Sequence, residues 1–168
     1  MNFTKNYLVF LFLLGFVFTN FADAQKTDDI SPKIANIKKL YKEIKNNEKN
    51  YKVEEISKFD DDGFEELTEI SKSGSEIKKI AKSISGSGDC GESYEYYFNK
   101  SEVFFVFFVS SCYVDERVIK SEKRYYFDGN KMIQFLDGKK NVKSGTEEFI
   151  NEENAIKHQI SELKIYTK

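Results

Sequence analysis

Few residues of this sequence are of types that carry out chemistry, and their spacing limits what each could do. There is one histidine, His158, and there are two cysteines, Cys90 and Cys112. A nucleophilic triad needs a base beside its nucleophile, and a structural zinc site needs about four His or Cys ligands. His158 lies between Lys157 and Gln159 on the polar flank of a helical pattern, which is typical of a surface residue. The sequence therefore predicts no catalytic residue, no metal site and no bound cofactor.

An acidic stretch, Asp60-Asp61-Asp62-Gly63, matches part of a calcium loop. With its glycine at the sixth position of such a loop, Asp60, Asp62 and Glu69 fall on ligand positions. The first ligand position then falls on Lys58, which cannot bind calcium, and no second helical pattern follows. We therefore interpret the stretch as an acidic turn between two strands.

Paired carboxylates occur at Glu54-Glu55, Glu65-Glu66 and Asp115-Glu116. Acid–base hydrolysis of a glycoside needs two carboxyl groups that face one cleft. Neighbouring residues of a strand point to opposite faces, so these doublets suit solvation better than catalysis. Gly86-Ser87-Gly88 lacks the lysine and the following helix of a phosphate-binding loop and is interpreted as a turn.

Tyrosines favour a binding function. Tyrosine combines a large apolar area with a polar tip, which suits recognition surfaces. Packing of these rings under helices or over lysine stems is the alternative, and the sequence leaves both open. The tyrosines concerned are Tyr94, Tyr96, Tyr97, Tyr113, Tyr125 and Tyr126. As a candidate binding surface we take Tyr94, Tyr96, Tyr126 and Arg124.

The amino terminus indicates export. Lys5 precedes an apolar run from Tyr7 to Phe18, and Ala22-Asp23-Ala24 offers the small residues that signal peptidase recognises. The run is shorter than the roughly 20 apolar residues of a membrane span. No cysteine follows that could carry a lipid anchor. We predict a signal peptide over residues 1–24, a secreted or periplasmic mature chain from Gln25, and membrane contact only through the signal peptide before cleavage.

Charge and cysteine content limit the partners. The 26 Lys and Arg residues nearly balance the 28 Asp and Glu residues, and the net charge is −2. Such a balance, with the two signs interspersed, gives no electrostatic basis for nucleic-acid binding. In an oxidising compartment, two cysteines are expected to be bonded to each other.

Two helical patterns flank the middle of the chain. Ser31-Pro32 is a helix start with serine as the cap, and apolar residues follow at helical spacing to residue 47. After Thr146 a second helical pattern runs to residue 165, with Glu147 and Glu148 in its first turn. We expect the second helix to help cover a dry face of the sheet, and we consider the same face for the first helix.

Between these helices, over residues 51–138, segments rich in Tyr, Phe, Val and Ile alternate with short turns, which indicates antiparallel strands. Val103 to Val109 is apolar on both faces and is expected to be covered on both sides or central. The candidate strands are 51–58, 64–72, 76–84, 92–98, 102–113, 117–127 and 131–137. The sequence thus predicts a single α+β domain over residues 25–168, an antiparallel meander of about six strands with a helix at each end.

An internal repeat strengthens this prediction. Tyr96–Phe104 aligns without gaps with Tyr125–Ile133, 29 residues later, and Ser73–Ile77 is a fainter third copy of the turn. Asn, Asp and Gly suit such turns. If the second hairpin turns about Ser101, the numbers of opposed residues sum to about 202, which places Phe98 opposite Phe104 and Cys90 opposite Cys112. The sequence therefore predicts a Cys90–Cys112 disulfide.

The run Tyr-Tyr-Phe-Asp-Gly-Asn-Lys-Met at residues 125–132 resembles the hairpin units of uncharacterised exported proteins. More distantly it is similar to repeats written Tyr-x-x-Gly-x-Leu. The resemblance covers Gly63–Gly138, and the unit at 96–104 departs from the pattern because it lacks the glycine. Units of this kind imply a sheet and imply no activity.

These observations favour a non-enzymatic exported binding or cell-envelope module whose partner is an unknown protein or envelope ligand. A small carboxylate-based hydrolase or a secreted inhibitor is the alternative, and acidic groups converging in a cleft would indicate it. A homodimer formed through open sheet edges or apolar faces is a third expectation.

Overall fold

A computed structural model describes residues 29–59, 65–85 and 90–167 of this 168-residue chain. The predicted signal peptide, the acidic stretch 60–63 and the glycine-rich turn 86–88 lie outside the described residues. Within the described part, neither helix combines the length and the apolar character that a bilayer crossing needs.

Eight strands form one sheet, and each strand pairs antiparallel with the next along the chain. They are β1 (Lys52–Phe59), β2 (Glu65–Ser73), β3 (Glu76–Ser85), β4 (Cys90–Asn99), β5 (Glu102–Val114), β6 (Arg117–Asp128), β7 (Lys131–Asp137) and β8 (Lys140–Val142). The predicted α+β meander is confirmed, but the sheet has eight strands rather than about six. The unpredicted β8 is a short, mostly polar segment that pairs with the end of β7.

Two helices lie at the ends of the described chain, close to the predicted ranges 31–47 and 146–165. They are α1 (Ser31–Asn47), followed by the short 3-10 helix η1 (Glu48–Asn50), and α2 (Glu147–Glu162), followed by η2 (Leu163–Ile165). The prediction that Ser31 caps α1 is wrong, because Ser31 is the first residue of the helix. Its backbone N–H donates a hydrogen bond to Asp29 Oδ1 at 3.0 Å. Thr146 caps α2 by accepting a 3.3 Å hydrogen bond from the backbone N–H of Phe149.

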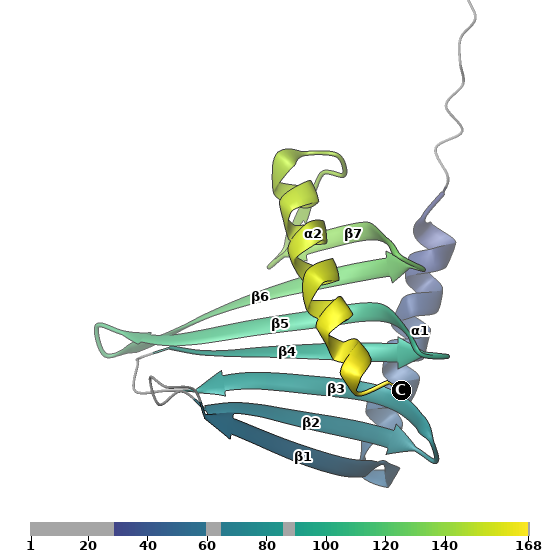
Figure 1. The fold of residues 1–168 in the computed structure, drawn as a ribbon. Coiled ribbons are helices and arrows are strands. Elements are labelled where there is room, and N and C mark those ends of the chain that lie inside the picture. The colour runs from purple at the N-terminus through teal and green to yellow at the C-terminus, as the bar shows by residue number, and fades with distance from the viewer. Residues whose placement is uncertain (1–28, 60–64, 86–89, 168) are drawn as a thin grey trace, which may run out of the picture.

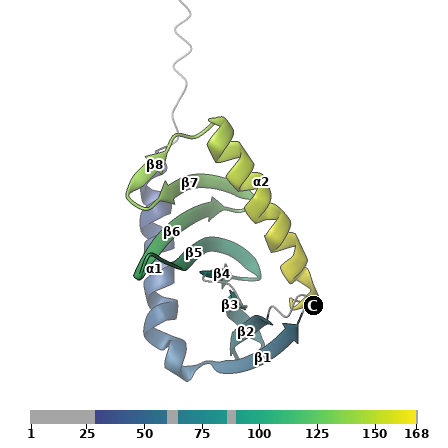
Figure 2. The same ribbon diagram turned by 90° about the vertical axis from the view of Figure 1, so that its left-hand side faces the viewer.

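The helices cover opposite faces of the sheet, and the expectation that both could share one face is wrong (Figure 2). Successive residues of a strand point to opposite faces, and both members of the Tyr96-Tyr97 pair are buried. Tyr97, Phe105 and Tyr126 pack with α1 residues, whereas Tyr96 packs with residues of α2. The central strands are thus apolar on both sides because each side receives a helix, as the Val103–Val109 run predicts.

The three repeated hairpins share a two-residue turn and a β-bulge. In β4–β5, Phe98 pairs with Val103 and Tyr97 with Phe105, so Phe104 is the extra residue of the bulge. The predicted pairing of Phe98 with Phe104 is therefore wrong. The same shift occurs in β2–β3 and β6–β7, where Lys78 and Ile133 take the equivalent place. A bulge makes two successive side chains share a face, and both Phe104 and Phe105 pack in the α1 cluster.

The bulge also restores the register that aligns the cysteines. Beyond Tyr97, opposed residues of β4 and β5 continue in step to Cys90 and Cys112, whose Cα atoms are 4.0 Å apart. The predicted Cys90–Cys112 disulfide is present. It closes the end of the hairpin that lies away from the bulge.

Candidate binding groove

A groove opens where α2 stops short of the first strands. Figure 1 shows α2 crossing the strands from β7 to β4 and ending beside β3, so the helix does not cover the same face of β1 and β2. The sheet is curled (Figure 2), and residues from the end of β1 and from the C-terminal end of the chain line one cavity. The groove between them is a cavity of about 490 Å³ lined by Lys58, Phe59, Glu66, Lys82, Ile84, Glu162, Leu163, Ile165 and Tyr166.

A smaller cavity continues this groove over the sheet. It measures about 200 Å³, shares Glu66, Lys82, Ile84 and Glu162 with the first, and extends to Tyr94, Tyr96 and Gln159. We refer to the two cavities together as the η2 groove. Residues of four strands, of the end of α2 and of η2 line it, so side chains far apart in the sequence, such as Lys58 and Tyr166, lie in one groove.

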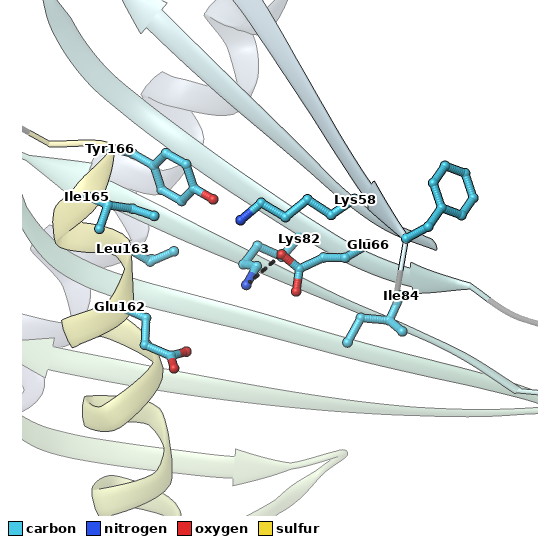
Figure 3. Close-up of a pocket in the computed structure, with 9 residues that line it drawn as sticks. Lys58, Glu66, Lys82, Ile84, Glu162, Leu163, Ile165 and Tyr166 are labelled. Atoms are coloured by element: carbon cyan, nitrogen blue, oxygen red, sulfur yellow. Dashed lines mark ion pairs between the residues drawn. The ribbon is translucent and has the colours of Figure 1, made fainter. Parts of the chain in front are cut away.

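Charged groups of both signs line the η2 groove (Figure 3). Lys82 Nζ lies 3.1 Å from Glu66 Oε1, which neutralises one pair of charges on the sheet side. Glu162 Oε1 lies 3.7 Å from Nε2 of His158, a contact that is an ion pair only when the imidazole is protonated. Among the described residues, Lys58 has no ion-pair partner. The groove therefore presents mixed charge on its walls.

Apolar side chains form the rest of the lining. Leu163 is buried beneath the groove, whereas Ile84 and Ile165 stay exposed although both are large and apolar. Phe59, at the end of β1, is 71% exposed. Exposed apolar side chains are ordinary when scattered, but these three line one cavity.

Tyr94 and Tyr96 meet the groove at its inner end. Tyr96 is 1% exposed, and its Oη donates a 2.8 Å hydrogen bond to Gln159 Oε1 on α2. Burial raises the pKa of Tyr96 far above its ordinary value, so the ring is a neutral, fixed part of the floor. Tyr94 is half-buried, stacks on Tyr96 with ring centroids 6.1 Å apart, and forms the accessible wall.

The other two predicted surface residues, Tyr126 and Arg124, lie on the α1 face. They line a separate cavity of about 270 Å³ together with Tyr41 and Phe107. Tyr126 is buried, and the Arg124 guanidinium lies 5.6 Å from the centre of the Phe107 ring and 2.6 Å from Glu122 Oε1. The four residues of the predicted binding surface thus divide between two cavities on opposite faces and do not form one surface.

The other chemically interesting residues are spread over the molecule. Glu54 accepts from Lys52 and Lys72 at 3.2 and 2.7 Å, and Asp115-Glu116 forms an exposed turn. Of the doublets, only Glu66 lines the η2 groove, where the second carboxylate is Glu162. Within residues 29–59, 65–85 and 90–167, no three His, Cys, Asp or Glu side chains are grouped to hold a metal ion.

Sequence reasoning missed the η2 groove except for its tyrosines. The reason is that Lys58, Lys82 and Glu162 come from three different elements and have no common spacing. One signal in the sequence could have indicated the groove. Phe59 and Ile84 are apolar residues at strand ends that are otherwise polar, where the core of the sheet does not need an apolar side chain.

Comparison with known proteins gives no family for this chain, since no family model, no curated protein and no solved structure matches it. The resemblance to exported hairpin-repeat proteins therefore stays a prediction.

Proposed function

We propose that this protein is an exported, non-enzymatic binding module whose η2 groove binds an apolar segment of a polypeptide. The observation that carries the proposal is the open cavity of about 490 Å³ lined by both apolar and charged side chains. Binding sites combine an apolar body with a few polar groups that fix the orientation of the ligand. Leu163, Ile84 and Ile165 supply the first, and Glu162, Lys58 and the Lys82–Glu66 pair supply the second.

A polypeptide fits this lining better than a lipid chain does. An acyl chain in the groove would desolvate Glu162, Lys58 and the Lys82–Glu66 pair and would offer them no polar group in exchange, which is costly. A peptide segment brings apolar side chains together with amide and charged groups that can pair with the walls. The walls also carry no excess of one sign, so the ligand is expected to have mixed charge.

The compartment in the proposal rests on two observations. The amino-terminal segment has the order of a secretory signal. The described part of the chain contains the Cys90–Cys112 disulfide, and such bonds persist in oxidising compartments.

The proposal is tested by fluorescence polarisation of short labelled peptides that carry a central Leu or Phe flanked by Lys and Glu, with all-polar peptides as the reference. Ile84→Arg places a charge in the groove and should weaken binding at least about tenfold, the loss of one buried apolar side chain. Ile84 is 41% exposed, so the variant should fold, which its thermal unfolding will show.

Ile119→Arg is the matched control. Ile119 is another exposed strand isoleucine, 56% accessible, and lines neither cavity of the groove. Equal losses in both variants, or no peptide binding at any concentration tried, would contradict the proposal. Binding of a fluorescent fatty acid in place of the peptides would indicate an envelope lipid as the ligand. If the protein cleaves the peptides, and if Glu66→Gln and Glu162→Gln abolish this cleavage, the carboxylate-based hydrolase would be favoured.

A further inference from the structure

One edge of the sheet is long and open. The strand order runs from β1 to β8, so these two strands form the edges. β8 has only three residues, whereas β1 has eight, pairs along its whole length with β2, and shows no bulge. Among the described residues no segment lies beyond β1, which is the lowest strand in Figure 1. A regular edge strand of this length presents unpaired N–H and C=O groups to any strand that can dock.

The protection that β1 carries against such docking is charge alone, from Lys52, Glu54, Glu55 and Lys58. The strand contains no proline, and Val53 and Phe59 are exposed although both are apolar. By strand alternation Val53 lies on the face that α1 covers further along the sheet, and Glu54 and Lys58 lie on the opposite face. Phe59, at the end of the strand, lines the η2 groove together with Lys58.

We propose that β1 pairs antiparallel with β1 of a second copy of this chain, about a twofold axis that places Ile56 opposite the partner's Ile56. In this register Glu54 lies opposite the partner's Lys58, and Val53 lies opposite the partner's Phe59. The twofold axis repeats each pair, because a symmetric interface uses the same patch twice. Directly opposed residues have Cβ atoms about 5 Å apart, within reach of an ion pair between a Glu and a Lys.

Neighbouring registers are worse, and this selects the proposed one. Opposed residues of an antiparallel pair lie on the same face of the sheet. Each allowed change of register therefore moves the twofold axis by one residue and keeps Lys58 and Glu54 on the same face. One step in one direction sets Glu55 opposite the partner's Glu55 and Lys52 opposite the partner's Lys58, both repulsive. One step in the other direction sets Ile56 opposite the partner's Lys58 and leaves Glu54 with no residue opposite it on β1 of the second copy. Residues 53–59 of β1 are thus self-complementary in one register.

The pairing adds a residue to the η2 groove. Lys58 lines the groove and has no ion-pair partner among the described residues, and the partner's Glu54 would supply one at the groove mouth. Each copy would contribute this carboxylate to the other. The interface is one strand pair and therefore small, so a dissociation constant in the micromolar range is expected.

The test is sedimentation velocity with the wild type, Glu54→Lys, Lys58→Glu and an equimolar mixture of the two variants. Each single variant replaces both attractive pairs with repulsive ones and should raise the dissociation constant about tenfold or more. In the mixture, the two substituted side chains face each other as one pair of opposite charges, and the two unchanged side chains, Lys58 and Glu54, face each other as the second. A heterodimer of near wild-type affinity should therefore form. Rescue by mixing also shows that the single variants are folded.

Three outcomes would overturn the proposal: a wild type that stays monomeric at high micromolar concentration, single variants that associate like the wild type, or a mixture that stays monomeric. Lys120→Glu, on an exposed part of β6, controls for the change of net charge and should leave the dimer unchanged. Ile84→Arg separates this inference from the binding function, since it should weaken peptide binding and leave the dissociation constant of the dimer as it is.

Discussion

Tyr125 Oη donates a 2.8 Å hydrogen bond to Glu152 Oε2, and this contact joins β6 to α2. On the opposite face of the sheet, Tyr97 Oη donates to Glu95 Oε2 at 2.6 Å. Both rings are buried. Burial, and then the neighbouring carboxylate, raises the pKa of Tyr125 and of Tyr97 far above the ordinary value of 10.0. Buried neutral phenols thus support both helix-covered faces.

The free energy of unfolding is predicted to fall as the pH rises above about 10. The raised pKa values mean that Tyr96, Tyr97 and Tyr125 keep their protons in the folded chain and lose them on unfolding at such pH. Proton release on unfolding makes stability decrease with pH, whereas at neutral pH the phenols are protonated in both states. Tyrosinate absorbance and thermal unfolding from about pH 8 to about pH 11 measure this.

Two variants sharpen that experiment. Tyr125→Phe should reduce the loss of stability per pH unit, because one fewer buried phenol is exposed. Tyr113→Phe should leave it unchanged, since Tyr113 is 54% exposed. If every tyrosine of the folded protein titrates near its ordinary pKa, the buried hydrogen bonds described above are wrong.

Replacing Glu48 is predicted to make the protein less stable at neutral pH and less sensitive to acid. Glu48 Oε1 accepts from Lys79 at 2.9 Å and from Lys45 at 3.1 Å, which ties the end of α1 to β3. Burial alone would raise the pKa of Glu48, but the hydrogen bonds from Lys79 and Lys45 outweigh it and hold the pKa below its ordinary value of 4.5. This stabilisation is present above pH 4.5 and is lost as the pH falls through the lowered folded pKa.

Glu48→Gln should therefore cost about 1–2 kcal/mol near neutral pH, with a difference from the wild type that shrinks in acid. Urea unfolding across the acid range measures both. Glu43→Gln is the control, because Glu43 meets Lys39 at 3.9 Å on an exposed helix surface. A difference that is constant down to the lowest pH would contradict the assignment.

The sequence was informative wherever one local rule decides the outcome. Helix limits follow from apolar spacing, and Cys90 and Cys112 were placed opposite each other by counting from a turn. The count was wrong near the turn, where Phe98 pairs with Val103, and became right only because the bulge at Phe104 adds a residue. Bulges depend on the twist of the sheet and on the elements that cover it, so no single residue type predicts them.

Which helix covers which face could not be predicted in this way. Residues of the two faces alternate along the central strands, and the neighbours Tyr96 and Tyr97 are of the same type and equally buried, one on each face. The groove was missed for a related reason, since it exists because α2 ends before β1 and β2. Helix length is visible in the sequence, but the path of the helix across the sheet depends on long-range packing.

Removal of the disulfide is predicted to lower the free energy of unfolding by about 3 kcal/mol, the usual effect for a closed loop of this size. Cys90 and Cys112 are separated by 22 residues. Cys90→Ser with Cys112→Ser, or a reductant added to the wild type, should give the same shift in thermal unfolding. The Ser110–Ser121 hydrogen bond of 2.8 Å nearby is exposed, so alanine at both positions should change little. A disulfide-bonded protein whose thermal unfolding does not change when reductant is added would contradict the prediction.

The two-residue turns offer a comparison between equal local geometries in different surroundings. Lys100 and Ser101 have φ of +50° and +67°, and Asp115 and Glu116 have φ of +48° and +61°, a region that suits Asn and Gly. Lys100→Asn with Ser101→Gly should stabilise the protein by about 1 kcal/mol, because the strain of positive φ is relieved in a hairpin that is part of the core.

The equivalent change at Asp115 and Glu116 should gain much less in global stability. This turn joins the ends of β5 and β6, where Tyr113 and Val118 are exposed. Among the described residues, β4 pairs with β5 only as far as Cys112, and β7 pairs with β6 only from Lys123 onward. A hairpin end with few buried contacts opens before the molecule unfolds, so relief of strain there is not measured by global unfolding. Hydrogen exchange of residues 113–120 should instead slow in the variant. Equal gains in denaturant unfolding at the two turns would show that the hairpin end unfolds together with the core.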